Sequence, residues 1–418
     1  MGCTGLLKHR IVLTRDTPTA QPYRRIPPYQ LKEVHSHLDK LLALEIISPS
    51  TSPYAAPIVL VRRKSGELRM CCDYRRLHEI TRKDAFLIPR MEECIDALGG
   101  SKYFSTLDLA SGYHQVEMAE EDKEKTAFTT PFGLYQWNRL PFGLVNPPAH
   151  FSRLMQKVMS DHLFQILLVY LEDLLVFSPT FEEHLHRLQK VFDRLREVNL
   201  KLNPNKCFLG CSSASFLGHV LTRDGLKTDL EKISAFKNFP QPTTVRDVRA
   251  FLGLTGYYRR FGENFASLAK PLHHLLVTPY KGDRNSKVSW TAECQESFDN
   301  IKSALTTAPL LGYTDFHKPF ILEVDASHSG LGAVLSLTQN GRPRVIAYAS
   351  RGLRKTERNM KIYSSMKLEM LALKWAVVDK FRSYLLGAKF AVYTDNNPLS
   401  HLKTAKLGTE MGWRIGGL

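Results

Sequence analysis

Two adjacent carboxylates in apolar surroundings are the first residues here that could do chemistry. Glu172 and Asp173 lie between two short apolar runs, residues 166–169 and 174–177. Apolar runs of this length around a tight polar break predict a β-hairpin. Neighbouring like charges in an apolar hairpin repel and lose hydration, so we expect a cation to neutralise them. These residues alone leave open an acidic turn that faces solvent.

A third carboxylate, Asp108, ends an apolar, β-prone run in residues 102–107. Asp108, Glu172 and Asp173 could converge on paired Mg²⁺ ions. Such ions favour carboxylate ligands and neutralise the attacking and leaving oxygens during phosphoryl transfer. The three residues therefore point to metal-assisted phosphoryl transfer.

Three stretches carry a family resemblance: FSTLDLASGYHQ (residues 104–115), TPFGLYQWNRLPFGL (130–144) and YLEDLLVFS (170–178). Together they resemble the reverse transcriptase of gypsy-type retrotransposons, and the resemblance extends from about residue 9 to about residue 407. It implies an α+β fold, a right-hand polymerase with fingers, palm and thumb, followed by a connection and a truncated RNase H-like α/β domain. It also implies an RNA-directed DNA polymerase in which Asp108, Glu172 and Asp173 are catalytic and hold two Mg²⁺ ions, with Mn²⁺ as an alternative.

The resemblance assigns four residues to the incoming nucleotide. Lys64 and Arg69 lie in an expected hairpin over residues 56–74 and match positions that hold the triphosphate. Tyr113 matches the residue that excludes a 2′-hydroxyl, and Phe142 matches one that lines the nucleotide pocket. Their residue types alone leave open an ordinary basic hairpin and a core tyrosine.

A second set of carboxylates follows in the expected RNase H-like domain. Asp325 ends an expected strand at 320–325, Glu369 lies on an expected helix at 363–381, and Asp395 follows a strand at 389–394. The resemblance implies that they hold metal ions for cutting RNA. The implied partners are an RNA template, a DNA primer, an RNA–DNA hybrid and deoxynucleoside triphosphates.

Composition sets the broad class. The 418 residues suffice for two or three domains, and a net charge of +16 predicts a polyanionic partner, although a solvated basic surface remains open. No apolar run approaches the ~20 residues that cross a bilayer, so no membrane contact is expected. The seven cysteines lack paired zinc spacing. A reduced, intracellular protein is expected, in a cytoplasmic particle or the nucleus.

Helices are predicted from apolar periodicity at 29–46, after Pro147, and at 181–199. In the last, Leu185 is expected to face the core, whereas His184 and His186 are expected at the surface. Further helices are predicted at 231–239, 245–254 and 256–265. The expected domains are an N-terminal extension (1–25), fingers and palm (26–225), thumb and connection helices (226–276), a linker (277–289), an incomplete RNase H-like domain (290–407) and an aberrant tail (408–418).

Two departures from the family bear on function. Glu172 stands where the family has aspartate, and a displacement of about 1 Å at a catalytic group can cost about 10²-fold in rate. The chain also ends before the fourth carboxylate and closing helix of the RNase H fold, so this domain is expected to be incomplete. The lack of an upstream protease and a downstream integrase suggests a fragment of a polyprotein. The alternative is a catalytically disabled relic that only binds template–primer nucleic acid. A host-adopted protein with a new role is a third reading.

Overall fold

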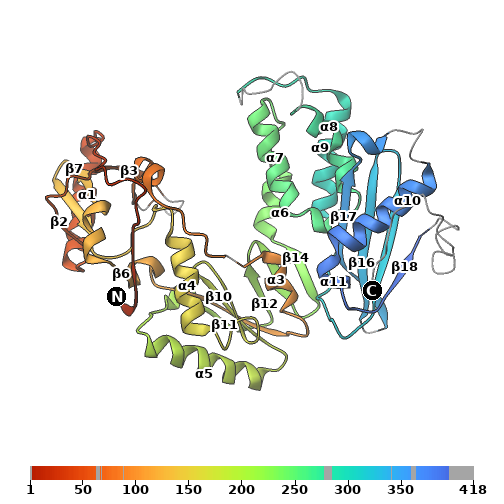
Figure 1. Ribbon diagram of the computed structural model, residues 1–418, viewed down its shortest axis with the longest axis horizontal. Helices are drawn as coiled ribbons and strands as arrows, with labels where there is room; N and C mark the ends of the chain where they lie inside the picture. Colours follow the sequence, from red (N-terminus) through yellow and green to blue (C-terminus); the bar gives the residue numbers. More distant parts are fainter. Residues whose placement is uncertain are drawn as a thin grey trace. The chain divides into compact units, whose positions relative to one another are not determined.

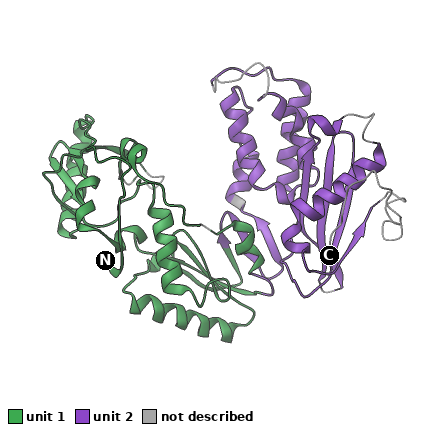
Figure 2. Ribbon diagram, viewed as in Figure 1, with its two compact units in different colours: residues 1–97, 101–214 green, residues 98–100, 215–418 purple. Residues whose placement is uncertain are grey.

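A computed structural model describes residues 2–62, 66, 68–87, 89–276, 285–339, 341–358 and 364–394 (Figure 1). The chain divides into two compact units, Met1–Ala97 with Ser101–Ala214, and Leu98–Gly100 with Ser215–Leu418 (Figure 2). These units are coarser than the expected subdomains, whose boundaries stay predictions. Lys64, Asp395 and the tail at 408–418 lie outside the described residues.

The first unit contains a five-stranded sheet in the order β2-β8-β7-β3-β4. The predicted hairpin is confirmed, since β3 and β4 pair in antiparallel fashion. Helix α1 (Pro28–Ala43) begins with a proline, whose missing N–H costs nothing in the first turn, and buries Val34, Leu38 and Leu41. The strands are β2 (Ile47–Pro49), β3 (Ala56–Arg62), β4 (Leu68–Cys72), β7 (Phe128–Thr130) and β8 (Gly133–Trp137).

The N-terminal segment contributes a strand to this unit, and its expected boundary as an N-terminal extension (1–25) stays a prediction. Strand β1 (Thr4–His9) pairs in parallel with β6 (Val116–Met118). This strand is too short and too polar for its alternation to be recognised in the sequence. Its pairing is also not a local feature, since the partner strand lies more than a hundred residues away.

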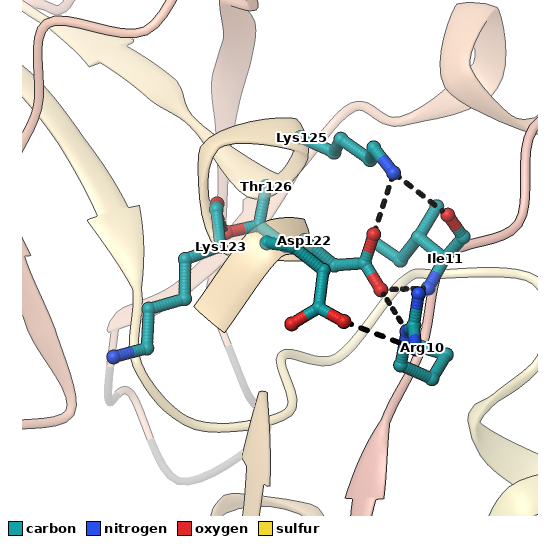
Figure 3. Close-up of polar contacts among 7 residues, drawn as sticks. Arg10, Ile11, Asp122, Lys123, Lys125 and Thr126 are labelled. Atoms are coloured by element: carbon teal, nitrogen blue, oxygen red, sulfur yellow. Dashed lines mark hydrogen bonds and ion pairs between the residues drawn. The ribbon is translucent and has the colours of Figure 1, made fainter. Parts of the chain in front are cut away.

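Asp122 fixes the chain just after β1 (Figure 3). Its buried carboxylate accepts hydrogen bonds from Arg10 Nε at 2.8 Å and from the Ile11 N–H at 2.9 Å. Lys125 Nζ lies 2.5 Å from the other carboxylate oxygen and 3.1 Å from the carbonyl oxygen of Ile11. These bonds compensate the buried charge and hold down the pKa of Asp122, against the rise that burial alone would cause.

A second sheet of this unit has the order β11-β5-β10-β9. The predicted carboxylate hairpin is confirmed by β9 (Leu167–Tyr170) and β10 (Asp173–Ser178), which pair in antiparallel fashion. Strand β5 (Tyr103–Asp108) lies between β10 and β11 (Phe208–Cys211). Helices α4 (Pro147–Met159) and α5 (Phe181–Glu197) pack against this sheet and against each other. The sheet is therefore the rigid base that carries Asp108 and Asp173.

The expected orientation of α5 was wrong at its first turn. Leu185 is 53% exposed, whereas His184 is fully buried. The inward positions are His184, Leu188, Val191 and Leu195, which are spaced for one helix face. A histidine takes the inward position because the two strands beneath it offer hydroxyl partners, described below. His186 is exposed, as expected.

The second unit begins with a small sheet, β12-β13-β14, followed by helices. Thr244 caps α7, and Asp247 completes the capping box. The expected helix at 256–265 was wrong, because α7 continues through Gly256 to Tyr257, Arg259–Phe261 form a 3-10 helix, and the next α-helix begins at Phe265. The elements are β12 (Ser213–Phe216), β13 (His219–Thr222), β14 (Gly225–Thr228), α6 (Leu230–Lys237), α7 (Val245–Tyr257), α8 (Phe265–His274) and α9 (Ala292–Thr306).

The predicted linker is described only in its last residues. There, Val245 N–H donates to Ser286 O at 3.0 Å and Val288 N–H donates to Thr243 O at 3.0 Å. This part of the segment is thus bonded to the start of α7.

A four-stranded sheet, β17-β16-β15-β18, completes the second unit, with α10 packed on β15 and β16 (Figure 1). The predicted single helix is interrupted, since α10 passes into a π-helix at Trp375–Lys380. None of the described helices is long and apolar enough to cross a membrane. The elements are β15 (Phe320–Ala326), β16 (Gly330–Gln339), β17 (Arg342–Gly352), α10 (Ser365–Lys374), α11 (Arg382–Leu385) and β18 (Phe390–Tyr393).

Candidate active site

The carboxylates of Asp108 and Asp173 are brought together by strand register. Asp108 is the last residue of β5, and it lies directly opposite Asp173, the first residue of β10. Directly opposed residues of antiparallel strands have Cβ atoms about 4.5–5.5 Å apart on the same face of the sheet. Strand register therefore places the two carboxylates side by side, as the convergence expected from the sequence requires. Asp173 is exposed, so an acidic turn that faces solvent stays open as the alternative.

Glu172 joins the pair from the hairpin turn. Tyr170 pairs with Asp173, so Leu171 and Glu172 form a two-residue connection. Leu171 adopts a left-handed conformation (φ 55°), which leucine rarely does. Strained backbone of this kind persists where the surrounding structure holds it in place, commonly at functional sites.

The three charges are close enough to disturb each other. Burial raises the pKa of the Glu172 carboxyl, and the negative charges of Asp108 and Asp173 raise it further. Desolvation and then Asp108 raise the pKa of Asp173, even though this residue still reaches solvent. The cluster therefore disfavours its own ionised form and calls for a cation.

Lys206 supplies a cation from within the chain. Its Nζ lies 3.3 Å from Oδ2 of Asp108, and its positive charge offsets part of the rise in the pKa values of Glu172 and Asp173. The pair is partly exposed, with 62% of the Lys206 side chain accessible, so it is worth about 0–1 kcal/mol. The sequence predicted a cation but gave no signal for which one, because Lys206 comes from a separate loop.

The side chains as they lie form a charge cluster rather than a finished metal centre. Within the described ranges, no three carboxylate, imidazole or thiolate groups are grouped closely enough to hold a metal ion. The donor set nevertheless fits Mg²⁺, which prefers carboxylate oxygens. Asp108 and Asp173 already share one face, and the weak Lys206 pair is easily replaced.

Three of the four predicted nucleotide residues lie beside this cluster. The guanidinium carbon of Arg69 lies 5.9 Å from the ring centroid of Phe142, and that ring lies 5.1 Å from the ring of Tyr113. Burial raises the pKa of Tyr113 to about 12, with a further contribution from the charge of Glu172. Arg69 in turn lowers the pKa of Glu172. A basic group and an aromatic wall thus adjoin the carboxylates.

The second set of carboxylates is arranged differently. Asp325 is exposed near the end of β15. Glu369 is 5% exposed on α10, and its Oε1 accepts the N–H of Ala326 at 3.0 Å. The helix and strand therefore place Asp325 and Glu369 near each other. The third predicted member, Asp395, lies outside the described residues.

Two family models match the chain. Residues 61–221 match "Reverse transcriptase (RNA-dependent DNA polymerase)", and residues 290–392 match "RNase H-like domain found in reverse transcriptase". The first match contains all three carboxylates of the palm cluster, and the second contains Asp325 and Glu369.

The chain is similar to retrovirus-related Pol polyproteins of Drosophila melanogaster. It is 42% identical to that of transposon opus over 399 residues, which are 92% of this chain and 39% of the polyprotein. It is 36% identical to that of transposon gypsy over 384 residues, 88% of this chain and 36% of the polyprotein. The chain thus spans less than half the length of these relatives.

Solved structures of reverse transcriptases are also similar to this chain. A foamy viral protease–reverse transcriptase dRH in complex with double-stranded DNA aligns with a TM-score of 0.85 at 26% identity, covering 97% of this chain and 70% of that one. A foamy viral protease–reverse transcriptase in complex with an RNA/DNA hybrid aligns with a TM-score of 0.79, also at 26% identity, covering 97% of this chain and 53% of that one.

Proposed function

Because the chain belongs with the reverse transcriptases of gypsy-type retrotransposons, carrying their polymerase domain and RNase H-like domain, we propose that it extends a primer 3′ end on an RNA or DNA template. The observation that carries the proposal is the register of β5 and β10, which sets Asp108 opposite Asp173 with Glu172 adjacent. Carboxylates crowded in this way suit a site that works on polyphosphates through cations.

In the proposed reaction, Asp108, Glu172 and Asp173 hold two divalent cations, Mg²⁺ or Mn²⁺. Bound there, the ions would stabilise the charge on the attacking primer oxygen and on the departing pyrophosphate. Lys206 would have to leave Asp108 for that carboxylate to serve as a ligand. The protein's own part is to fix the carboxylates on a rigid sheet, so that little reorganisation is needed.

The nucleotide side of the site follows from the neighbours of Glu172. Arg69 and Lys64 would bind the triphosphate of a deoxynucleotide, since a guanidinium matches phosphate oxygens geometrically. Tyr113 would face the sugar as a steric wall against a 2′-hydroxyl, with Phe142 packed behind it. The RNase H-like site would use Asp325, Glu369 and Asp395 for RNA in a hybrid.

The rival proposal is a disabled relic that binds template–primer and catalyses nothing. The specific observation in its favour is Glu172, whose carboxylate is one methylene longer than the family's aspartate. Mg²⁺ demands near-ideal octahedral geometry, which a displaced ligand impairs.

Primer extension on an RNA template with Mg²⁺ separates the two, comparing the natural chain with its Glu172→Asp variant. Extension by both supports the polymerase. Extension by the variant alone identifies the site and shows that this copy is disabled. Failure of both, in protein shown to be folded and to bind template–primer, contradicts the polymerase proposal. Binding that weakens with salt is expected in every case and decides nothing.

A further inference from the structure

A buried histidine joins the two strands that carry Asp108 and Asp173. His184 on α5 is fully buried, as are Ser105 on β5 and Ser178 on β10. Its Nε2 lies 2.7 Å from Ser105 Oγ, and its Nδ1 lies 2.9 Å from Ser178 Oγ. Both ring nitrogens therefore have a partner in the interior, and the two partners come from neighbouring strands.

The surrounding bonds give this chain of contacts a direction. Ser178 Oγ donates its proton to Thr180 O at 2.9 Å, so it must accept from His184 Nδ1–H. At the other end, Ser105 Oγ accepts the N–H of Gly210 on β11 at 2.8 Å. A neutral imidazole has one donor and one acceptor nitrogen, so Nε2 accepts the hydroxyl proton of Ser105. Only the neutral Nδ1–H tautomer satisfies every group.

The electrostatic setting keeps the ring neutral. Burial lowers the pKa of His184, and the positive charge of Arg187 lowers it further. Arg187 is itself ion-paired with Glu183 and donates to the carbonyl of Phe177 on β10. From β5, the ring of Tyr103 lies 6.3 Å away. A proton on Nε2 would remove the acceptor for Ser105 and place a charge in the core.

The two serines that His184 contacts lie on the same strands as two carboxylates of the candidate site. Ser105 precedes Asp108 by three residues on β5, and Ser178 ends the strand that Asp173 begins. Between them the two strands are in continuous register, from Ser178 opposite Tyr103 to Asp173 opposite Asp108. A slip or splay of β5 against β10 would separate the two carboxylates.

We propose that His184 is a positioning residue of the polymerase site: through Ser105 and Ser178 it fixes β5 against β10 and thereby the spacing of Asp108 and Asp173. The proposal rests on the proposed polymerase function. His184 touches neither the carboxylates nor any substrate, so its effect reaches the site through the strands alone.

The first test reads the tautomer without nucleic acid. Two-bond ¹H–¹⁵N spectra of the full chain with labelled histidine, compared with His184→Phe to identify the signal, should show a neutral Nδ1–H ring between pH 6 and 8. The exposed His186→Gln variant is the matched control and should leave that signal unchanged. A signal of the Nε2–H tautomer, or one that titrates near the ordinary histidine pKa, would contradict the hydrogen bonds assigned between His184 and the two serines.

The second test separates positioning from stability. His184→Phe removes one hydrogen-bond partner from each of two buried hydroxyls, although Ser178 Oγ still donates to Thr180 O and Ser105 Oγ still accepts from Gly210 N–H. The triple variant Ser105→Ala/His184→Phe/Ser178→Ala removes both hydroxyls and should regain much of the melting temperature, less the contribution of the bond from Gly210. Positioning predicts that the triple variant still extends a primer about 10-fold or more slowly at saturating nucleotide, with primer–template affinity unchanged. Extension that recovers together with stability contradicts it.

The two proposals fail in different ways. Where the natural chain does not extend, the same series is made on Glu172→Asp. Absence of extension by the Glu172→Asp protein contradicts the polymerase function. The histidine spectrum still tests the hydrogen bonds of His184 with Ser105 and Ser178.

Discussion

The two sets of carboxylates differ in what balances their charge. In the palm, Asp108, Glu172 and Asp173 crowd together, and burial and then mutual repulsion raise the pKa values of Glu172 and Asp173. The weakly held Lys206 and, at Glu172, Arg69 offset only part of that rise. In the RNase H-like domain, the buried Glu369 accepts a backbone N–H from the strand that carries Asp325. The palm carboxylates therefore carry negative charge that the protein only partly neutralises, whereas Glu369 is hydrogen-bonded within the folded core.

This difference separates two uses of a buried carboxylate. Asp122 shows the second use in its full form, with hydrogen bonds from Arg10, Ile11 and Lys125. A carboxylate compensated in this way stabilises the fold, and its removal leaves donors stranded. A carboxylate crowded by its own kind destabilises the metal-free protein and is retained for a ligand. The same substitution should therefore have opposite effects at the two kinds of position.

The largest effect is expected on catalysis. Asp173→Asn should lower primer extension by about 10²-fold or more, because a metal ligand and its charge are lost. Asp325→Asn, at the other site, should leave extension unchanged. Single-turnover extension with Mg²⁺ measures both, on whichever of the natural chain and Glu172→Asp is active. Equal losses from the two variants would break the distinction between the sites.

Asp122→Ala should cost about 3–5 kcal/mol of unfolding free energy, because it leaves charged donors without their buried partner. Urea unfolding measures this cost. The control is Glu121→Ala, which removes the exposed partner of Arg10 and should cost less than about 1 kcal/mol. Limited proteolysis should also cut the variant first near residues 2–13. A cost no larger than the control's would show that Asp122 is not compensated as described.

Glu369→Ala should cost about 1–3 kcal/mol, since the N–H of Ala326 loses its acceptor. Glu369→Gln keeps an acceptor oxygen and should recover most of this. Denaturant unfolding measures the free energy of both variants, and Asp325→Ala, at an exposed neighbouring carboxylate, is the control. An unchanged unfolding free energy in Glu369→Ala would show that Glu369, like the palm carboxylates, does not stabilise the fold.

The smallest effect has the opposite sign. The pKa of Glu172 is raised in the folded protein, so its ionisation destabilises the fold as pH rises from the ordinary value through the raised one. Glu172→Gln should thus raise the melting temperature of the metal-free protein by about 1 °C or more at pH 8. The gain should vanish well below the ordinary glutamate pKa of about 4.3, where both the folded and the unfolded state hold the proton. A lower melting temperature at pH 8 would contradict the charge deficit.

Local pattern was enough to predict the elements of the site. The apolar runs around Glu172 and before Asp108 predicted β9, β10 and β5, because strands alternate with period two and turns carry the polar residues. The resemblance added the roles. That Asp108 and Asp173 lie opposite each other needed the register, which no local pattern gives.

The failures share a physical cause, which is that tertiary partners overrode local preference. His184 was expected outside and Leu185 inside, since imidazole is polar, but Ser105 and Ser178 make the interior the better place for it. One helix was expected to end at Leu254 and the next to begin at Gly256, whereas α7 continues through Gly256 to Tyr257 although glycine is a weak helix former. Lys206 reaches Asp108 from a loop whose sequence carries no sign of the contact.

The crowded carboxylates of Asp108, Glu172 and Asp173 are expected to form a divalent-cation site. A Mn²⁺ titration followed by electron paramagnetic resonance tests it most directly, comparing the metal-free chain with Asp108→Asn, both carrying Asp325→Asn to silence the second set. We expect the Asp108→Asn protein to bind Mn²⁺ about 10-fold or more weakly. Superimposable titrations of the two proteins would contradict it.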